Sequence, residues 1–178
     1  MRKLNVIEMN RITVDDFKKS RKIPLTVVLD DVRSMYNVGS VFRTADAFRI
    51  ESIYLCGITA CPPHQEIHKT ALGAEDSVEW THMKDTVEAL NRLKADGYEV
   101  IAIEQVEGST MLQDFEVDTN KKYAIVLGNE VKGVKQEVVD MCDGCIEIPQ
   151  YGTKHSLNVS TAAGIVMWKF FDGLKNIF

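Results

Sequence analysis

Residues 148–160 read IPQYGTKHSLNVS and lead directly into an apolar segment with helical periodicity. Pro149 and Gly152 favour turns in the first half of this stretch. Three small polar side chains alternate with apolar residues in its second half: Ser156, Asn158 and Ser160. These side chains can donate and accept hydrogen bonds, so the stretch is typical of a loop that surrounds a polar ligand.

Two earlier segments have a similar character. Residues 37–44, NVGSVFRT, come after the apolar run 25–29, and residues 128–133, GNEVKG, come after the apolar run 123–127. Each segment combines glycine with hydrogen-bonding side chains just beyond a predicted strand. The sequence therefore contains three candidate ligand-binding loops.

Short apolar runs alternate with helical segments along most of the chain. We predict strands at 25–29, 52–56, 77–80, 98–103, 123–127 and 144–148. We predict helices at 38–48, 64–71, 85–96, 134–142 and 160–174, and Ser160 is the expected N-cap of the last one. This alternation indicates an α/β fold with a mostly parallel sheet flanked by helices. Open sheets of this kind bind ligands at the carboxyl ends of their strands, where the three polar loops fall.

In order and spacing, the three loops resemble the motifs of the SpoU (TrmH-like) family of SPOUT RNA 2′-O-ribose methyltransferases, over about residues 23–172. The resemblance implies a SPOUT fold with a C-terminal deep trefoil knot. It also implies a homodimer, RNA as substrate, and S-adenosylmethionine as methyl donor to a ribose 2′-hydroxyl. None of these properties follows from periodicity.

The same resemblance implies a set of catalytic residues: Asn37, Arg43, Glu130, Ser156 and Asn158. Arginine stays protonated in proteins, so Arg43 is expected to contact an RNA phosphate or a developing alkoxide rather than act as a base. Asparagine is also a preferred N-cap residue, so Asn37 can cap the helix that follows it. Glu130 is expected at a helix start, where it would orient Arg43 or Asn37. An exposed loop position is expected for His155, and Lys69 is open between RNA contact and a solvated surface.

Cofactor binding is expected at four positions, with Glu104 as a weaker candidate: Ile103, Gly128, Ile148 and Leu157. Gly128 would let the ligand approach the backbone, and the three apolar side chains would pack against adenine. Gln150 and Tyr151 depart from the methionine-containing sequence often found in the family, which affects the details of this pocket.

Charge is distributed unevenly along the 178 residues, whose net charge is −5. Residues 1–22 contain seven Lys or Arg and three acidic residues, whereas residues 23–178 contain 14 and 23. We predict a short basic N-terminal helical extension at 1–22, with Thr13 as N-cap and Pro24 at its end, and a methyltransferase domain at 23–178. The extension can pack on the domain or contact RNA, and both roles stay open.

The four cysteines raise the possibility of a metal site, since Cys142 and Cys145 have ligand spacing and Cys61 lies near His64 and His68. We favour free thiols and no metal, because Cys56 and Cys145 stand among apolar residues. Without a leader-like segment or a long apolar stretch, the expected location is cytoplasmic, with no membrane contact.

Two other functions compete with the enzyme. A noncatalytic RNA-binding or assembly module would use the same fold, although all polar motif residues are present. A nucleotide-dependent enzyme of another class is disfavoured because no G-x-G-x-x-G follows the first strand. The absence of a separate RNA-binding domain from this sequence slightly favours tRNA over rRNA.

Overall fold

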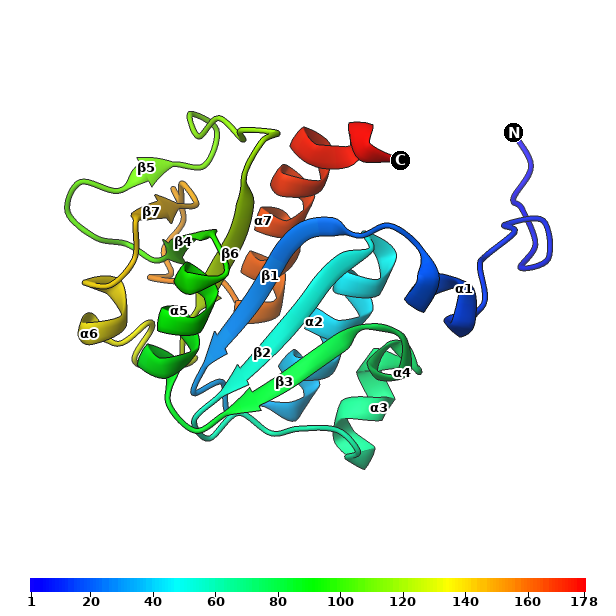
Figure 1. Ribbon diagram of the computed structural model, residues 1–178, viewed down its shortest axis with the longest axis horizontal. Coiled ribbons are helices and arrows are strands. Elements are labelled where there is room, and N and C mark those ends of the chain that lie inside the picture. The colour runs from blue at the N-terminus through cyan, green and yellow to red at the C-terminus, as the bar shows by residue number, and fades with distance from the viewer.

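The computed structural model describes residues 1–178 and contains one seven-stranded sheet in which all neighbouring strands are parallel (Figure 1). The strand order is β3-β2-β1-β6-β4-β7-β5. The strands are β1 Ile23–Asp30, β2 Ile50–Cys56, β3 Glu79–Met83, β4 Tyr98–Ile103, β5 Thr110–Met111, β6 Lys122–Leu127 and β7 Gly144–Glu147. The predicted α/β class is confirmed, and the sheet is parallel throughout.

Helices cover both faces of this sheet and create two hydrophobic cores (Figure 1). The helices are α1 Val14–Lys19, α2 Met35–Ala47, α3 Gln65–Ala71, α4 Ala74–Ser77, α5 Thr86–Ala95, α6 Gln136–Val139 and α7 Val159–Leu174, followed by a 3₁₀ turn at Lys175–Ile177. α2, α3, α4 and α7 share the larger core, and α5 and α6 share the smaller one. The interior strand β1, between β2 and β6, is buried along nearly its whole length, as expected for a strand covered on both faces.

Several predicted boundaries are corrected by the structure. The third strand begins at Glu79 rather than residue 77, and the predicted helix at 134–142 is only the four-residue α6. Backbone N–H groups at Val134 and Lys135 donate to the carboxylates of Glu104 and Asp30, which hold this segment outside the helix. The two-residue strand β5 was not predicted, because it is too short to have a detectable alternating pattern.

α2 packs closely against α3 because Gly39 has no side chain. A Cβ atom at Gly39 would lie 2.1 Å from Thr70 Oγ1 and 2.3 Å from the Ile67 carbonyl oxygen. This glycine of the first polar segment lies within α2 and therefore serves the packing of α2 against α3.

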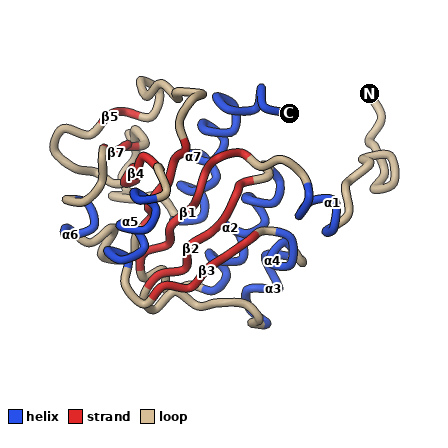
Figure 2. The backbone as a smooth tube through the Cα atoms, in the orientation of Figure 1, coloured by secondary structure: helices blue, strands red, loops and turns tan.

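The N-terminal segment is anchored to the body through α1. Thr13 caps this helix as predicted, by accepting a hydrogen bond from the Asp16 N–H, and Phe17 is buried in the larger core. Pro24 does not end the extension, since it is the second residue of β1. Residues 1–12 are exposed and extend away from the body (Figure 2).

The parallel strands direct the loops after β1, β4, β6 and β7 to the same edge of the sheet. Residues far apart in the sequence can therefore meet there.

As for membranes, none of the helices has the length and apolarity needed to cross one.

Candidate active site

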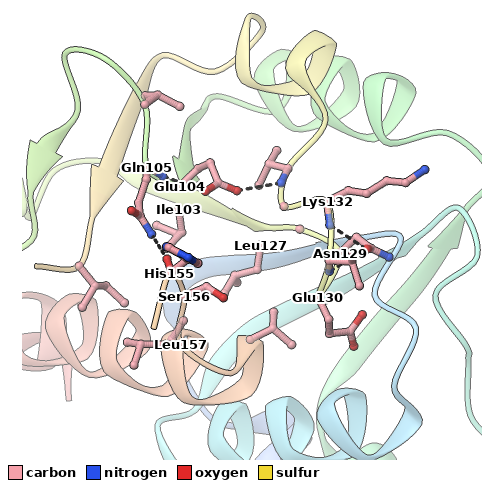
Figure 3. A pocket seen from close by; sticks show the side chains of 18 of the residues that line it. Ile103, Glu104, Gln105, Leu127, Asn129, Glu130, Lys132, His155, Ser156 and Leu157 are labelled. Atoms are coloured by element: carbon pink, nitrogen blue, oxygen red, sulfur yellow. Dashed lines mark hydrogen bonds between the residues drawn. The ribbon is translucent and has the colours of Figure 1, made fainter. Parts of the chain in front are cut away.

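A cavity of about 670 Å³ opens at the carboxyl edge of β4, β6 and β7 (Figure 3). Its walls come from three segments: residues 103–106 after β4, residues 127–136 after β6, and residues 148–162 leading into α7. Ten residues discussed from the sequence line it: Ile103, Glu104, Gly128, Glu130, Ile148, Gln150, His155, Ser156, Leu157 and Asn158. A volume of about 300–1,000 Å³ is usual for a small-molecule site.

Three polar side chains from separate parts of the sequence form a hydrogen-bonded row beside this cavity. Asn158 Nδ2 donates to Asn37 Oδ1 at 3.1 Å, and Asn37 Nδ2 donates to Glu130 Oε1 at 3.0 Å. Each of the three polar segments contributes one member, although residues 37–44 lie within α2 and not in the loop that we expected. We refer to Asn37, Glu130 and Asn158 as the polar row.

Glu130 is held mainly by the N-terminal end of α2. Its carboxylate oxygens accept hydrogen bonds from the backbone N–H groups of Arg33 at 3.0 Å and Ser34 at 2.9 Å. Partial burial by itself would raise the pKa of Glu130, but these two N–H groups and the Asn37 amide together lower it below its ordinary value. The side chain is therefore an anion at neutral pH and a weak base.

The helix caps differ from those that we predicted. Ser34 caps α2, while Asn37 lies in its first turn with a buried side chain. Asn158, not Ser160, caps α7, because Asn158 Oδ1 accepts from the N–H groups of Ser160 and Thr161 at 2.9 and 3.3 Å. Asn158 directly precedes the first residue of α7, whereas Ser160 is already the second residue of the helix, so the acceptor of Asn158 can reach both N–H groups.

The loop after β6 closes on itself in a tight turn. Asn129 and Gly133 exchange two backbone hydrogen bonds, and Asn129 Oδ1 accepts from the N–H groups of Val131 and Lys132. Glu130 therefore lies in a turn and not at a helix start, which corrects our prediction. The Asn129 side chain also donates to the Asp31 carbonyl oxygen at 2.8 Å, so the turn is attached to the end of β1.

Gly128 has a different structural role from the one expected. A Cβ atom at this position would lie 2.1 Å from both the Gly133 carbonyl carbon and the Val134 nitrogen. The missing side chain thus makes room for the returning backbone of the loop itself. Gly128 still lines the cavity, but the space beside its Cα is already filled by protein.

A cluster of charged side chains around the buried Asp30 contacts the segment that follows this loop. Asp30 is fully buried; it accepts from Thr86 Oγ1 at 2.6 Å and from the Lys135 N–H at 3.2 Å. Lys135 Nζ lies 2.7 Å from Asp31 Oδ2 and 3.4 Å from Asp30 Oδ1. These contacts join the end of β1 to α5 and to the segment that follows the loop after β6.

Arg43 is separated from the other candidate catalytic residues. It is exposed on α2, has no hydrogen bond or ion pair, and is absent from the cavity wall. Arg43 follows Asn37 by six residues, which in an α-helix places the two side chains about 120° apart around the axis and about 9 Å apart along it. One chain therefore does not bring Arg43 to the polar row.

Two residues that contact the site were missed from the sequence. Asn129 shapes the loop after β6, and the known preference of asparagine for turns was a usable signal. Gln105 Nε2 donates to the His155 carbonyl oxygen at 2.7 Å, across a separation of 50 residues, and no local pattern indicates such a contact. His155, expected in an exposed loop, is exposed.

The cysteines are all free thiols. No group of three or more His, Cys, Asp or Glu side chains is arranged to hold a metal ion. Burial raises the pKa of Cys142 to about 12 and also raises that of Cys145. Cys142 Sγ instead contacts the Val138 carbonyl oxygen, and Cys145 Sγ contacts that of Glu104.

Known proteins resemble this chain in sequence. A protein of Staphylococcus aureus that is assigned to the TrmH family of tRNA/rRNA methyltransferases is 30% identical over 161 residues, which cover 88% of this chain and 64% of that protein. A counterpart in Staphylococcus haemolyticus is 31% identical over the same length. The chain thus spans 64% of the length of each of these relatives, which is slightly less than two thirds.

Solved structures share the fold. The A. aeolicus TrmH/SpoU tRNA modifying enzyme superposes with a TM-score of 0.80 at 26% identity, covering 92% of this chain and 83% of that one. An AdoMet-bound rRNA methyltransferase from Sinorhizobium meliloti gives a TM-score of 0.79 at 27% identity, covering 89% and 60%. The model of the SpoU rRNA methylase family matches residues 24–168, which include all three polar loops. The chain belongs to the SpoU rRNA methylase family.

Proposed function

We propose that this protein is an S-adenosylmethionine-dependent RNA 2′-O-ribose methyltransferase that acts as a homodimer. One observation carries the proposal: the polar row joins all three family motifs beside a cavity of cofactor size. The bound AdoMet in the related S. meliloti enzyme supports the choice of cofactor. When bound, S-adenosylmethionine supplies an electrophilic methyl group on a sulfonium centre.

The cavity wall fits such a cofactor. Ile103, Ile148 and Leu157 offer apolar surface to an adenine ring, and Leu157 is 38% exposed although it is a large apolar residue. Backbone groups of residues 149–157 can bind polar edges, because among them only the His155 carbonyl oxygen has a hydrogen-bond partner within the protein. Residues 1–22 and 23–178 remain, in this proposal, the extension and the methyltransferase domain.

Within the polar row, most hydrogen-bonding capacity is already in use. Asn158 uses its oxygen to cap α7 and its amide to hold Asn37. Asn158 and Asn37 therefore position Glu130 and the start of α7, while the Ser156 hydroxyl has no partner and can bind the substrate ribose. The low pKa of Glu130 makes it an orienting anion rather than the group that removes the hydroxyl proton.

We place Arg43 at the active site of the second subunit. On α2 and the adjacent α7, an exposed face contains Tyr36, Arg43, Ile165 and Trp168 at helical spacing. Three of these are large apolar or aromatic residues exposed by 38–53%, which is typical of a surface that another protein covers. Pairing two copies through this face would bring each Arg43 to the neighbouring molecule, where it would bind RNA phosphate or stabilise the alkoxide.

The C-terminal knot is also part of this proposal. After β7 the chain runs past the end of β4, where Gln105 contacts His155, and then returns to α2, where Asn158 contacts Asn37. This path is the kind that a threaded C-terminal segment requires. As substrate we favour tRNA slightly over rRNA, with the basic residues of 1–22 as an additional RNA contact in a chain of negative net charge.

Methyl transfer from labelled S-adenosylmethionine to total unmodified tRNA and rRNA, followed by digestion to nucleosides, tests the proposal. We expect label in a 2′-O-methylnucleoside and a loss of about 100-fold or more for Arg43→Ala. The matched control is Arg92→Ala, an exposed arginine of α5 on the opposite face of the sheet, which should retain full activity. Label in a base would contradict ribose specificity, and RNA binding without label would favour the noncatalytic module.

Mixing two inactive variants tests the position of Arg43. Subunits with Arg43→Ala keep the polar row, and subunits with Asn158→Ala keep Arg43. If Arg43 acts across the dimer, mixed dimers regain one working site and recover part of the activity. No recovery from dimers shown to exchange subunits would place Arg43 in its own subunit's site.

A further inference from the structure

Residues 149–157 form one wall of the cavity with very little support from the rest of the chain. They contain no helix or strand, and residues 151–157 are all exposed. Only one hydrogen bond joins residues 149–157 to the rest of the protein, from Gln105 Nε2 to the His155 carbonyl oxygen at 2.7 Å (Figure 3). The position of this wall therefore depends on a single side chain.

Gln105 is well placed to serve as a fixed anchor. It is the second residue after β4, and its backbone N–H donates to Glu104 Oε1 at 2.8 Å. Glu104 is itself bonded to β7, because its N–H donates to the Ile146 carbonyl oxygen at 3.2 Å. The anchor thus starts from two paired strands of the sheet.

Glu104 fixes the opposite wall from the same place. Its Oε2 atom accepts a hydrogen bond from the Val134 N–H at 3.0 Å, at the end of the loop after β6. Two adjacent residues at the end of β4 therefore reach in two directions, Glu104 to the loop after β6 and Gln105 to residues 149–157 (Figure 3). The width of the cavity between these loops is set by this pair.

We propose that Gln105 is a positioning residue which holds residues 149–157 in the conformation that binds the methyl donor. This inference rests on the proposed function. A wall that samples other conformations weakens ligand binding in proportion to the time that it spends in them. The Gln105 contact limits this sampling before the ligand arrives, so it should affect affinity for the methyl donor and leave the chemical step unchanged.

Gln105→Glu is the direct test, because it keeps the size of the side chain but places a carboxylate oxygen against the His155 carbonyl oxygen. We expect the Kd and the KM for S-adenosylmethionine to rise roughly five- to tenfold, as for the loss of one hydrogen bond. The kcat at saturating S-adenosylmethionine should stay the same. The control is Gln113→Glu, whose exposed side chain contacts only Asp114.

A second measurement does not depend on the cofactor. Trypsin can cut after Lys154, which is exposed in the middle of the loop, and mass spectrometry identifies the product. Without ligand, Gln105→Glu should be cut at Lys154 several times faster than the wild type and the Gln113→Glu control.

The outcomes separate this inference from the proposed function. If wild-type protein binds no S-adenosylmethionine, the proposed function fails, while the rate of cleavage at Lys154 still decides whether Gln105 holds the loop. Equal cleavage rates in wild type and Gln105→Glu would overturn the inference. Faster cleavage with an unchanged Kd in a protein that binds S-adenosylmethionine would overturn it as well.

Discussion

The floor and the outer wall of the cavity are built in opposite ways. The floor, formed by the polar row and the loop after β6, is connected by hydrogen bonds among side chains and backbone from β1, α2, β6 and α7. The outer wall, residues 149–157, has one such bond. The floor is thus held by several hydrogen bonds and the wall by one, which predicts different responses to mutation in the two regions.

Two glycines give the largest expected contrast. Gly128→Ala would force a Cβ atom to within 2.1 Å of the Gly133 and Val134 backbone, so we expect it to lower the free energy of unfolding by about 3 kcal/mol. Gly152→Ala in the wall meets no atom within 4 Å and should change this free energy by about 0.5 kcal/mol or less. Urea unfolding of both variants is the measurement, and equal shifts would remove the distinction between floor and wall.

Two polar side chains give a smaller contrast. Asn37→Ala removes a buried amide that bonds to both Glu130 and Asn158. Because both partners lose a hydrogen bond, we expect the free energy of unfolding to fall by about 2 kcal/mol. Ser156→Ala removes an exposed hydroxyl without a partner and should cost less than about 0.5 kcal/mol. A comparable loss in Ser156→Ala, measured by the same urea titration, would mean that the Ser156 side chain contributes to stability as much as the polar row does.

The smallest expected effect concerns pH. Because the folded state lowers the pKa of Glu130 below the ordinary 4.5, the ionised carboxylate stabilises the protein above that value. As the pH falls from about 5 through the lowered pKa, Glu130 gains a proton and this contribution is lost. The stability difference between wild type and Glu130→Gln should therefore shrink over that range.

Chemical unfolding at a series of pH values measures this difference. The control is Glu107→Gln, since Glu107 is exposed and has no hydrogen-bond partner. A difference between wild type and Glu130→Gln that stays constant from pH 7 to pH 3 would contradict the hydrogen-bond arrangement around Glu130.

The boundaries of regular structure were predictable where apolar patterns are long. The strand 98–103 matches β4 and the helix 160–174 nearly matches α7, because each has enough apolar residues in one period to be distinctive. The short α6 and β5 were predicted poorly or not at all. Their conformations depend on contacts such as that between Glu104 and Val134, which connect residues 30 positions apart.

The site shows the same division. The polar segments could be found from residue types. Glu130 was expected to orient Arg43 or Asn37, and its carboxylate accepts a hydrogen bond from the Asn37 amide at 3.0 Å but has none from Arg43. The caps were wrong at Asn37 and Ser160, because several polar residues near a helix start can serve as cap and only the backbone geometry selects one. The expected role of Gly128 was also wrong. The space that a side chain would need at this position is filled by the backbone of residues 133 and 134, not left open for a ligand.

By itself, the sequence determined the α/β class, the parallel sheet, the family and the three polar loops, because these depend on local periodicity and on residue types at fixed spacing. Only the tertiary structure decided that Asn37, Glu130 and Asn158 form one row, that Arg43 faces away from it, and that Gln105 holds residues 149–157. In each case the distance between the side chains is set by the paired strands and packed helices that lie between them. A pattern within a short segment of sequence does not encode such distances.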